Sequence, residues 1–396
     1  MNEEGLRERL ADYRTPDEAA AKQRAWRVIE RGLAERSVDS RPPRRRRGRL
    51  VLAAVAAVTV AVGALTPPGA AVAEWIRDAV RPGQENARPA LLRLPAEGRL
   101  LVNSEEGPWI VGRGGSMRRL GDYTDARWSP RGLFVIATRG RQLVALDQVG
   151  EVRWSLARAR AVNSPAWSPD GFRVAYLAGR SLRVVNGDGS GDSLLASAVA
   201  STEPSWRPGQ GASHEVAFAD SRGRVTIADT DSGRTLWRSR PGPVPAQLAW
   251  TPDGRRLVVL EPTVLRVLDN DGTSIARAAM PAGSDARAMA IGPAGQSVAV
   301  IRDLGPARSE VVSLPLNDPT AAGARTLAGD GRFTDLAWSP DGRWLLVAWR
   351  EADQWLFIRS ARARKIEAVS NISRQFDPGG RGRGTFPALG GWCCAR

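Results

Sequence analysis

The sequence contains very few of the residues on which catalytic and metal sites most often depend. It has one histidine, His214, and two cysteines, Cys393 and Cys394, which are adjacent. A Ser-His-Asp hydrolase needs a histidine as its general base, and a hydrolase domain of the α/β type would carry a Gly-x-Ser-x-Gly elbow, which the stretch at 188–192 lacks. Two neighbouring cysteines cannot build a disulfide framework or a tetrahedral metal site. We therefore expect a non-enzymatic protein with no catalytic residue, no metal and no cofactor.

Lysine is also scarce, because Lys22 and Lys365 are the only two in the chain. Arginine supplies the rest of the positive charge, a preference that is typical of a GC-rich bacterial genome. The net charge is +15, but beyond residue 49 it is spread without a second dense basic run. Nucleic-acid binding depends on clustered cations, so we expect no nucleic-acid partner.

The N-terminal segment, residues 1–49, is basic and contains one clear helix signal. Thr15 followed by Pro16, Asp17 and Glu18 fits a capping box with proline at the first helical position. The predicted helix covers residues 16–36 and has a narrow apolar stripe of Ala19, Trp26, Ile29 and Leu33. That stripe would cover either the membrane surface or another part of the chain, or it would bind a cytoplasmic partner.

An uncharged stretch of 24 residues, 50–73, follows the arginine-rich residues 41–49. About 20 apolar residues cross a bilayer as a helix, and arginines that precede such a helix stay in the cytoplasm. We predict one transmembrane helix over residues 50–73, an inside N-terminus and a juxtamembrane linker over residues 74–97. Pro67 and Pro68 leave the outer limit of the span open, and a cleaved signal peptide would need a much shorter basic region.

Tandem repeats dominate the rest of the chain, and their signature is a tryptophan followed by a proline-containing turn. Six turn prolines are separated by 39, 39, 44, 41 and 47 residues, which is the period of a four-stranded propeller blade. Each turn precedes two short runs rich in Val, Ile and Leu, as expected for β-strands. The turns occur at Trp128–Pro130, Trp167–Gly171, Trp206–Pro208, Trp250–Gly254, Ile291–Gly295 and Trp338–Gly342.

These repeats resemble the WD40-like (PD40) repeats of TolB-type proteins, which carry Trp-Ser-Pro-Asp-Gly in each blade. The match is strongest at Trp167–Gly171 and Trp338–Gly342, and it covers roughly residues 98–396. The resemblance implies that the segment before each tryptophan is the innermost strand of a blade. The turn after the tryptophan then leads to the second strand.

The two ends of the repeat region complement each other. Residues 98–120 contain three strand candidates without a preceding Trp-Ser-Pro, whereas Phe386–Gly391 resembles the innermost strand around Ser164–Pro169 and has no blade after it. Closing a propeller in this way removes open sheet edges. We predict an all-β, seven-bladed propeller over residues 98–396, with four-stranded blades and closure by the C-terminal strand.

Three groups of residues within the repeats invite a functional interpretation. Asp170, Asp253 and Asp341 recur once per blade, which favours turn capping over calcium binding. The five repeat tryptophans, at 128, 167, 206, 250 and 338, occupy one equivalent position, which favours blade packing. Trp344, Trp349 and Trp355 are not equivalent, and we consider them as an exposed contact patch.

The adjacent pair Cys393-Cys394 lies outside the membrane in this topology, where oxidation is permitted. A vicinal disulfide, an intermolecular bridge and two free thiols are the alternatives.

The leading functional hypothesis is a single-pass, membrane-anchored scaffold of the bacterial cell envelope whose extracytoplasmic propeller binds a protein or peptide at one face. The alternative is transmembrane signalling. In that case the helix at residues 16–36 would bind a cytoplasmic regulator, as in anti-sigma factors, while the propeller senses an external ligand. The zinc motif of the common anti-sigma domain is absent from residues 1–49.

Overall fold

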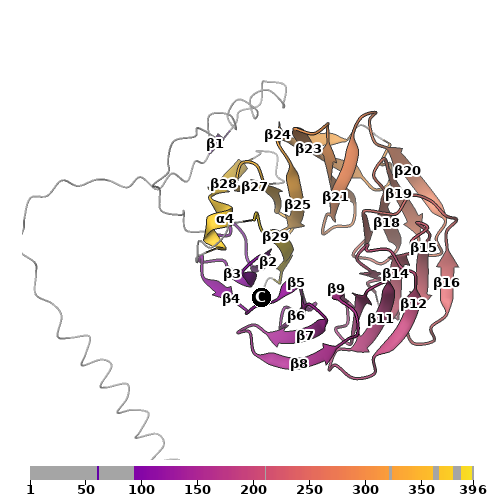
Figure 1. Ribbon diagram of the computed structural model, residues 1–396. Helices are drawn as coiled ribbons and strands as arrows, with labels where there is room; N and C mark the ends of the chain where they lie inside the picture. The colour runs from indigo at the N-terminus through magenta and orange to yellow at the C-terminus, as the bar shows by residue number, and fades with distance from the viewer. Residues whose placement is uncertain are drawn as a thin grey trace, which may run out of the picture. The chain divides into compact units, whose positions relative to one another are not determined.

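The computed structural model describes residues 60–61, 93–209, 211–320, 323–359, 365–377 and 385–394. Their strands form seven antiparallel sheets arranged as blades around a central axis (Figure 1). This confirms the predicted seven-bladed propeller with four-stranded blades. The predicted helix at residues 16–36, its cytoplasmic partner and the signalling alternative concern residues outside this description, and they stay predictions.

The strands fall into blades in chain order, with the innermost strand of each blade given first. Blade 1 is β29 (Ala388–Cys393), β2 (Arg99–Ser104), β3 (Gly107–Gly112) and β4 (Met117–Arg119). Blade 2 is β5 (Thr124–Trp128), β6 (Phe134–Arg139), β7 (Gln142–Asp147) and β8 (Val152–Ala157). Blade 3 is β9 (Val162–Trp167), β10 (Arg173–Ala178), β11 (Ser181–Asn186) and β12 (Ser193–Ser197).

Blade 4 is β13 (Ser205–Trp206), β14 (Glu215–Ala219), β15 (Val225–Asp229) and β16 (Thr235–Arg238). Blade 5 is β17 (Gln247–Trp250), β18 (Arg256–Leu260), β19 (Val264–Asp269) and β20 (Ser274–Ala279). Blade 6 is β21 (Asp285–Ile291), β22 (Ser297–Asp303), β23 (Arg308–Pro315) and β24 (Ala324–Asp330). Blade 7 is β25 (Phe333–Trp338), β26 (Trp344–Trp349), β27 (Gln354–Arg359) and β28 (Lys365–Ser370), and a short helix, α4 (Ile372–Gln375), follows it.

The ring closes as predicted, because the C-terminal strand β29 is the innermost strand of blade 1. It pairs with β2 from Arg99 opposite Cys393 to Asn103 opposite Ala388. Trp392 is buried there, and its indole nitrogen donates a hydrogen bond to the carbonyl oxygen of Glu97 at 3.2 Å. Leu94 and Ala96, from the end of the expected linker, are also buried in the core between blades 7 and 1.

Within the expected span at 50–73, the structure describes only Val60–Ala61, which form strand β1. β1 pairs with β28 at the outer edge of blade 7, where an edge strand has unpaired backbone groups. The helix expected across the span is therefore not present at these two residues. Among the described residues, no helix has the length and apolar character needed to cross a membrane.

The alternating strand directions give the ring two distinct faces. Turns from first to second and from third to fourth strand lie on one face, which we call the turn face. The remaining hairpins and the connections between blades lie on the other, the connection face. On the turn face each blade packs against the previous one: a Cβ on Gly342, whose φ is +67°, would come within 3.1 Å of Pro293 in the turn before it. Glycine is therefore required at this turn both by its positive φ and by the close approach.

The repeat tryptophans pack between blades, as predicted. Trp206 and Trp250 are buried, and the others are half-buried against the interblade clusters. The indole nitrogen of Trp206 donates to the carbonyl oxygen of Ala166 in blade 3 at 2.9 Å, and that of Trp338 donates to the carbonyl oxygen of Ala290 in blade 6 at 3.2 Å. Each of these two tryptophans therefore ties its blade to the preceding one.

Candidate functional site

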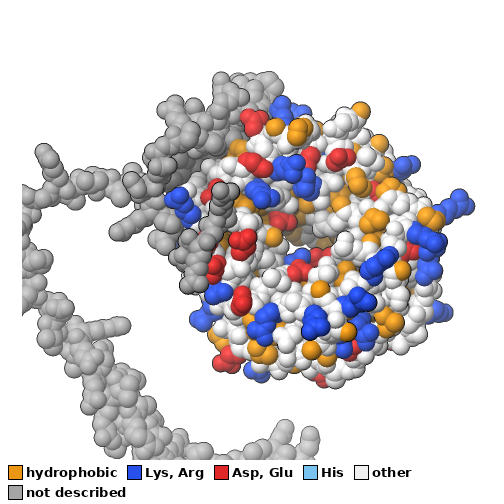
Figure 2. Space-filling view, viewed as in Figure 1, with side chains coloured by type: hydrophobic (Ala, Val, Ile, Leu, Met, Phe, Trp, Pro, Cys, Tyr) orange, Lys and Arg blue, Asp and Glu red, His pale blue; other side chains and the backbone are white. Residues whose placement is uncertain are grey.

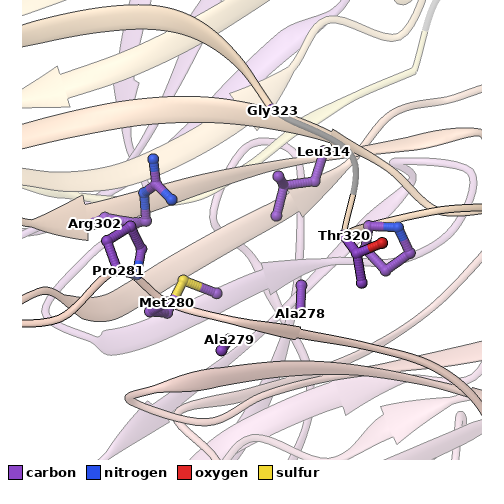
Figure 3. Close-up of a pocket in the computed structure, with 9 residues that line it drawn as sticks. Ala278, Ala279, Met280, Pro281, Arg302, Leu314, Thr320 and Gly323 are labelled. Carbon is purple, nitrogen blue, oxygen red and sulfur yellow. The ribbon is translucent and has the colours of Figure 1, made fainter.

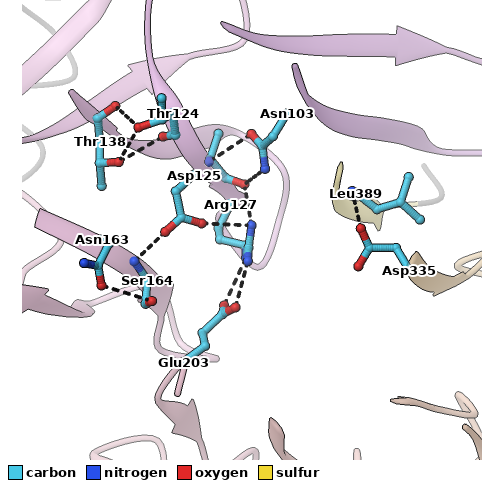
Figure 4. Close-up of polar contacts among 11 residues, drawn as sticks. Asn103, Thr124, Asp125, Arg127, Thr138, Asn163, Ser164, Glu203, Asp335 and Leu389 are labelled. Atoms are coloured by element: carbon cyan, nitrogen blue, oxygen red, sulfur yellow. Dashed lines mark hydrogen bonds and ion pairs between the residues drawn. The ribbon is translucent and has the colours of Figure 1, made fainter. Parts of the chain in front are cut away.

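Four charged side chains converge at the axis of the ring, and we call them the channel cluster: Asp125, Arg127, Glu203 and Asp335. Asp125 and Arg127 lie on β5, Asp335 lies on β25, and Glu203 lies on the connection that leads to β13 (Figure 4). Innermost strands face the axis, so residues that are far apart in sequence meet there. Figure 2 shows acidic side chains at the edge of a central hollow.

Arg127 is the centre of this cluster. Its guanidinium group makes two hydrogen bonds to Glu203, at 3.0 Å from Nε and 2.7 Å from Nη2, and its Nη1 lies 3.3 Å from Asp125. The other oxygen of Asp125 accepts a hydrogen bond from the backbone amide of Ser164 in blade 3. Asp335 accepts one from the amide of Leu389 on the closing strand at 3.1 Å. The cluster therefore connects blades 1, 2, 3, 4 and 7.

Two of the three carboxylates near this guanidinium group, Asp125 and Asp335, have a raised pKa, mainly because they are buried. Burial, with a smaller contribution from the nearby Glu203, raises the pKa of Asp335 to about 6, against the lowering effects of the Leu389 amide and Arg127. Burial also raises the pKa of Asp125, despite the ion pair with Arg127.

Exposed arginines lie on the hairpins and blade connections of the connection face over blades 2, 3 and 4. Five of them form no ion pair with any described residue, whereas the acids of this sector, Glu203 and Asp220, are both paired. A sixth, Arg139, stacks over Tyr123 with its guanidinium carbon 5.4 Å from the ring centre. We call this group the arginine arc: Arg139, Arg141, Arg160, Arg180, Arg222 and Arg240.

Backbone hydrogen bonds between hairpins and blade connections hold the arc together. The amide of Val162 donates to Gly140, that of Gly179 to Ala161, and that of Val199 to Arg180, at 2.9, 2.9 and 3.1 Å. The amide of Gly242 continues the series by donating to Arg222 at 3.1 Å. The arginines thus lie on one continuous, rigid strip of the connection face.

The rest of the connection face is mixed in charge. Exposed Asp122, Asp285 and Glu351 lie over blades 1, 6 and 7, where Arg332 and Arg350 are also exposed. Figure 2 shows Lys and Arg side chains together with Asp and Glu around the ring. A surface with one cationic sector selects partners by charge and by orientation.

A cavity of about 260 Å³ lies between blades 5 and 6 (Figure 3). Met280, Pro281, Leu314 and Thr320 line it, together with Arg302, which is held by Glu310 at 2.6 Å. The lining contains no nucleophile next to a general base. Among the described residues, no group of three or more His, Cys, Asp or Glu side chains could hold a metal ion.

The turn aspartates cap their turns, as predicted. Asp253 accepts hydrogen bonds from the Thr251 hydroxyl at 2.6 Å and from the Arg255 amide at 3.1 Å. The Thr251 bond is the main reason that the pKa of Asp253 is lowered. Asp170 and Asp341 make the same contacts with Ser168 and Ser339.

The proposed contact patch of Trp344, Trp349 and Trp355 is wrong. Their exposed fractions are 8%, 4% and 0%. They lie on β26 and β27, central strands whose two faces both pack against neighbouring blades, so neither face reaches solvent.

The histidine and the two cysteines considered in the sequence analysis lie on the turn face. His214 lies 3.8 Å from Asp229, near the start of β14. Cys393 and Cys394 form a vicinal disulfide at the end of the closing strand, beside Pro130. Sequence reasoning missed the arginine arc, although arginines next to glycine at the short hairpins, as in Arg139-Gly140-Arg141, were a usable signal.

No protein-family model matches the sequence, and no curated protein matches it. Solved structures do: 1639 chains are similar, which is too many for the fold alone to indicate a function. The β-propeller domain of Cps50 (Swd1) from Myceliophteria thermophila aligns at 14% identity and a TM-score of 0.50, over 63% of this chain and 86% of that one.

Two more solved structures align with similar sequence identity and TM-score. A candidate 6-phosphogluconolactonase from Bacteroides uniformis aligns at 15% identity and a TM-score of 0.52, over 69% of this chain and 97% of that one. A chain of the Mitotic Checkpoint Complex aligns at 16% identity and a TM-score of 0.51, over 73% and 86%. The chain is therefore a seven-bladed β-propeller with WD40-like structural neighbours.

Proposed function

We propose that this protein is a non-enzymatic, membrane-anchored scaffold of the TolB type, whose propeller lies outside a bacterial cytoplasmic membrane and binds an acidic segment of a partner protein. The observation that carries the proposal is the arginine arc. Exposed guanidinium groups that form no ion pair with a described residue match carboxylates in geometry and charge. One structural neighbour is a chain of the Mitotic Checkpoint Complex, a multiprotein assembly, which supports protein binding as a use of this fold.

The chemistry of the arc favours an acidic protein segment over a nucleic acid. Binding of single-stranded nucleic acid relies on exposed aromatic rings on which bases stack. Among the described residues, the aromatic ring that stacks with an arginine of the arc is Tyr123, and it is buried beneath Arg139. A peptide with several carboxylates needs only the guanidinium groups and the rigid backbone strip that presents them.

Membrane anchoring depends on the uncharged residues 50–73. Inside a bilayer every backbone group must be satisfied within the segment, which favours a helix. The two-residue pairing of β1 with β28 would then give way. We expect the full chain to remain in the membrane pellet after alkaline extraction and a chain without residues 50–73 to be released. Release of the full chain would refute the anchor without affecting the proposed binding face.

Binding is tested with a poly-glutamate peptide as the probe. The variant R141Q/R180Q/R222Q removes three positive charges from the arc and should weaken binding about tenfold at low salt. The control R234Q/R255Q/R277Q removes three exposed arginines elsewhere on the ring, so it changes the net charge equally. Equal losses in the two variants would show that net charge, and not the arc, binds the peptide.

A further inference from the structure

Large exposed apolar side chains gather on the turn face of blades 2 and 3. Leu133, Val149, Val152 and Phe172 are 54%, 52%, 53% and 72% exposed, and we call them the apolar patch. Leu133 and Phe172 follow the turn glycines of the two blades. Val149 and Val152 lie at the turn from β7 to β8. The amide side chain of Gln148 donates to the carbonyl oxygen of Gly132 at 2.8 Å, which joins the two turns of blade 2.

The repeats provide an internal control, because equivalent positions in other blades are polar. Leu133 and Phe172 correspond to Arg255, Gln296 and Arg343, which follow the turn glycines of blades 5, 6 and 7. The fold therefore tolerates a charged or amide side chain at this position, and it does not require an apolar one.

At the turn between the third and fourth strands, the positions equivalent to the two valines of blade 2 are also polar in other blades. Val149 corresponds to Asp188 and Asp271, whose carboxylates accept hydrogen bonds from backbone amides two residues later. Val152 corresponds to Thr235 and Ser274, each the first paired residue of its outer strand. In blade 2 Asp147 alone caps this turn, through the Val149 and Glu151 amides, and the two valines add exposed apolar area that costs stability unless something covers it.

The patch lies beside the point where the chain enters the ring. Arg99, the first residue of β2, donates a hydrogen bond from its guanidinium group to Gly132 at 3.0 Å, directly next to Leu133. The segment that precedes β2 therefore approaches blade 1 from the turn face. Residues 74–92 could extend on the order of 60 Å, so the predicted span can reach a bilayer under this face.

Exposed Arg131 and Arg153 flank the apolar side chains, and neither forms an ion pair with a described residue, whereas one exposed acid, Glu151, lies between Val149 and Val152. Apolar side chains with arginines beside them fit a phospholipid surface with anionic headgroups. The predicted membrane span would hold the propeller close to the lipid surface. A few apolar side chains are then enough for persistent contact, because the effective concentration of lipid near them is high.

We propose that the apolar patch rests on the anionic lipid surface of the membrane that holds the anchor. This rests on the proposed function, because it takes residues 50–73 as a membrane span. The propeller then lies with blades 2 and 3 of its turn face against the bilayer. The connection face, with the arginine arc, points away from the membrane and is open to a partner.

The test uses the full chain in nanodiscs of phosphatidylcholine and phosphatidylglycerol that contain a lipid with a photoactivatable acyl chain. After irradiation, mass spectrometry locates the labelled peptides. We expect label in residues 50–73 and in the turns that contain Leu133, Val149 and Phe172. The variant L133D/F172D should lose at least about fivefold of the turn label and keep the label in the span. Its control, R255D/Q296D, changes the same turn positions in blades 5 and 6 and should keep both.

The outcomes separate the inference from the anchor. Label in the span but not in the turns would overturn the inference and leave the anchor standing. Absence of both would refute the anchor and the inference together. Turn label that L133D/F172D does not reduce would also overturn the inference, as would crosslinks between two copies through the patch, because a second copy would then be its occupant. An unchanged melting temperature in L133D/F172D would show that the variant is folded.

Discussion

The two faces of the propeller are built on different principles. On the turn face, a serine or threonine and an aspartate cap a proline-glycine turn in blades 3, 5 and 7, and blades 2 and 3 expose apolar residues beside their turns. The connection face has no repeating motif, and its polar contacts join residues from blades that are distant in sequence. The repeat therefore encodes the scaffold on one face, while the features specific to this protein lie on the other face and in the exceptions to the repeat.

The largest expected effect comes from removing the one cation of the channel cluster. Replacing Arg127 with methionine keeps much of its volume but leaves Asp125 and Glu203 without their partner. Unpaired carboxylates near the axis should destabilise the fold by about 3 kcal/mol. The midpoint of guanidinium-induced unfolding measures this change. R141M, an exposed arginine of the same face, should cost less than about 0.5 kcal/mol. Equal shifts in the two variants would show that the cluster has no special role in the ring.

A second prediction concerns Asp335, whose raised pKa makes its charged form unfavourable in the folded state. A group with a raised folded pKa contributes stability below its unfolded value near 3.8, and that contribution is lost as the pH rises through about 6. Asp335→Asn keeps an oxygen for the Leu389 amide and removes the charge. It should stabilise the protein at pH 7 by about 1–2 kcal/mol and have little effect near pH 4.

Thermal unfolding of both proteins between pH 4 and pH 7 checks this prediction. The Asp303→Asn variant is a control, because Asp303 is paired with Arg287 and should lose stability instead of gaining it. A constant difference between D335N and the wild type across this pH range would contradict the ionisation of Asp335 as the cause.

The sequence predicts the turn face well because the same short-range chemistry recurs in blades 3, 5 and 7. The turns at Trp167–Gly171 and Trp338–Gly342 contain their own capping groups, so their geometry can be predicted without the rest of the chain. Closure was also predictable, because Phe386–Gly391 resembles an innermost strand and blade 1 lacked one.

The channel cluster could not be predicted in this way. Arg127 and Glu203 are 76 residues apart, and their contact depends on how far each inner strand and connection reaches towards the axis. The burial of Trp344, Trp349 and Trp355 was misjudged for a related reason. Trp344 and Trp355 each precede a short apolar run that the sequence predicts as a strand, but a central strand of a blade is covered on both faces by its neighbours.

The smallest expected effect is the difference in stability cost between two serine substitutions on the turn face. One serine lies in a turn that also has the capping aspartate, and the other lies in a turn that lacks it. In blade 7 the buried Ser339 hydroxyl donates to Asp341 and accepts from the Trp344 amide at 2.9 Å. In blade 2 Ser129 accepts from the Phe134 amide at 3.0 Å, but Arg131 occupies the position of the aspartate. S339A should cost about 1–2 kcal/mol because it leaves the buried Trp344 amide without its acceptor and removes one of the two donors to Asp341. S129A should cost less.

Acid unfolding refines this last comparison. Burial acts to raise the pKa of Asp341, but the Ser339 hydroxyl and the Arg343 amide outweigh it, so the pKa is lowered. A lowered folded pKa contributes stability that is present above the unfolded value and is lost as the pH falls through the folded pKa. The cost of S339A should therefore shrink in strong acid, whereas that of S129A should stay constant. If both costs were independent of pH, the serine-aspartate bond would not be what distinguishes the complete turn, and the backbone alone would hold the repeating face together.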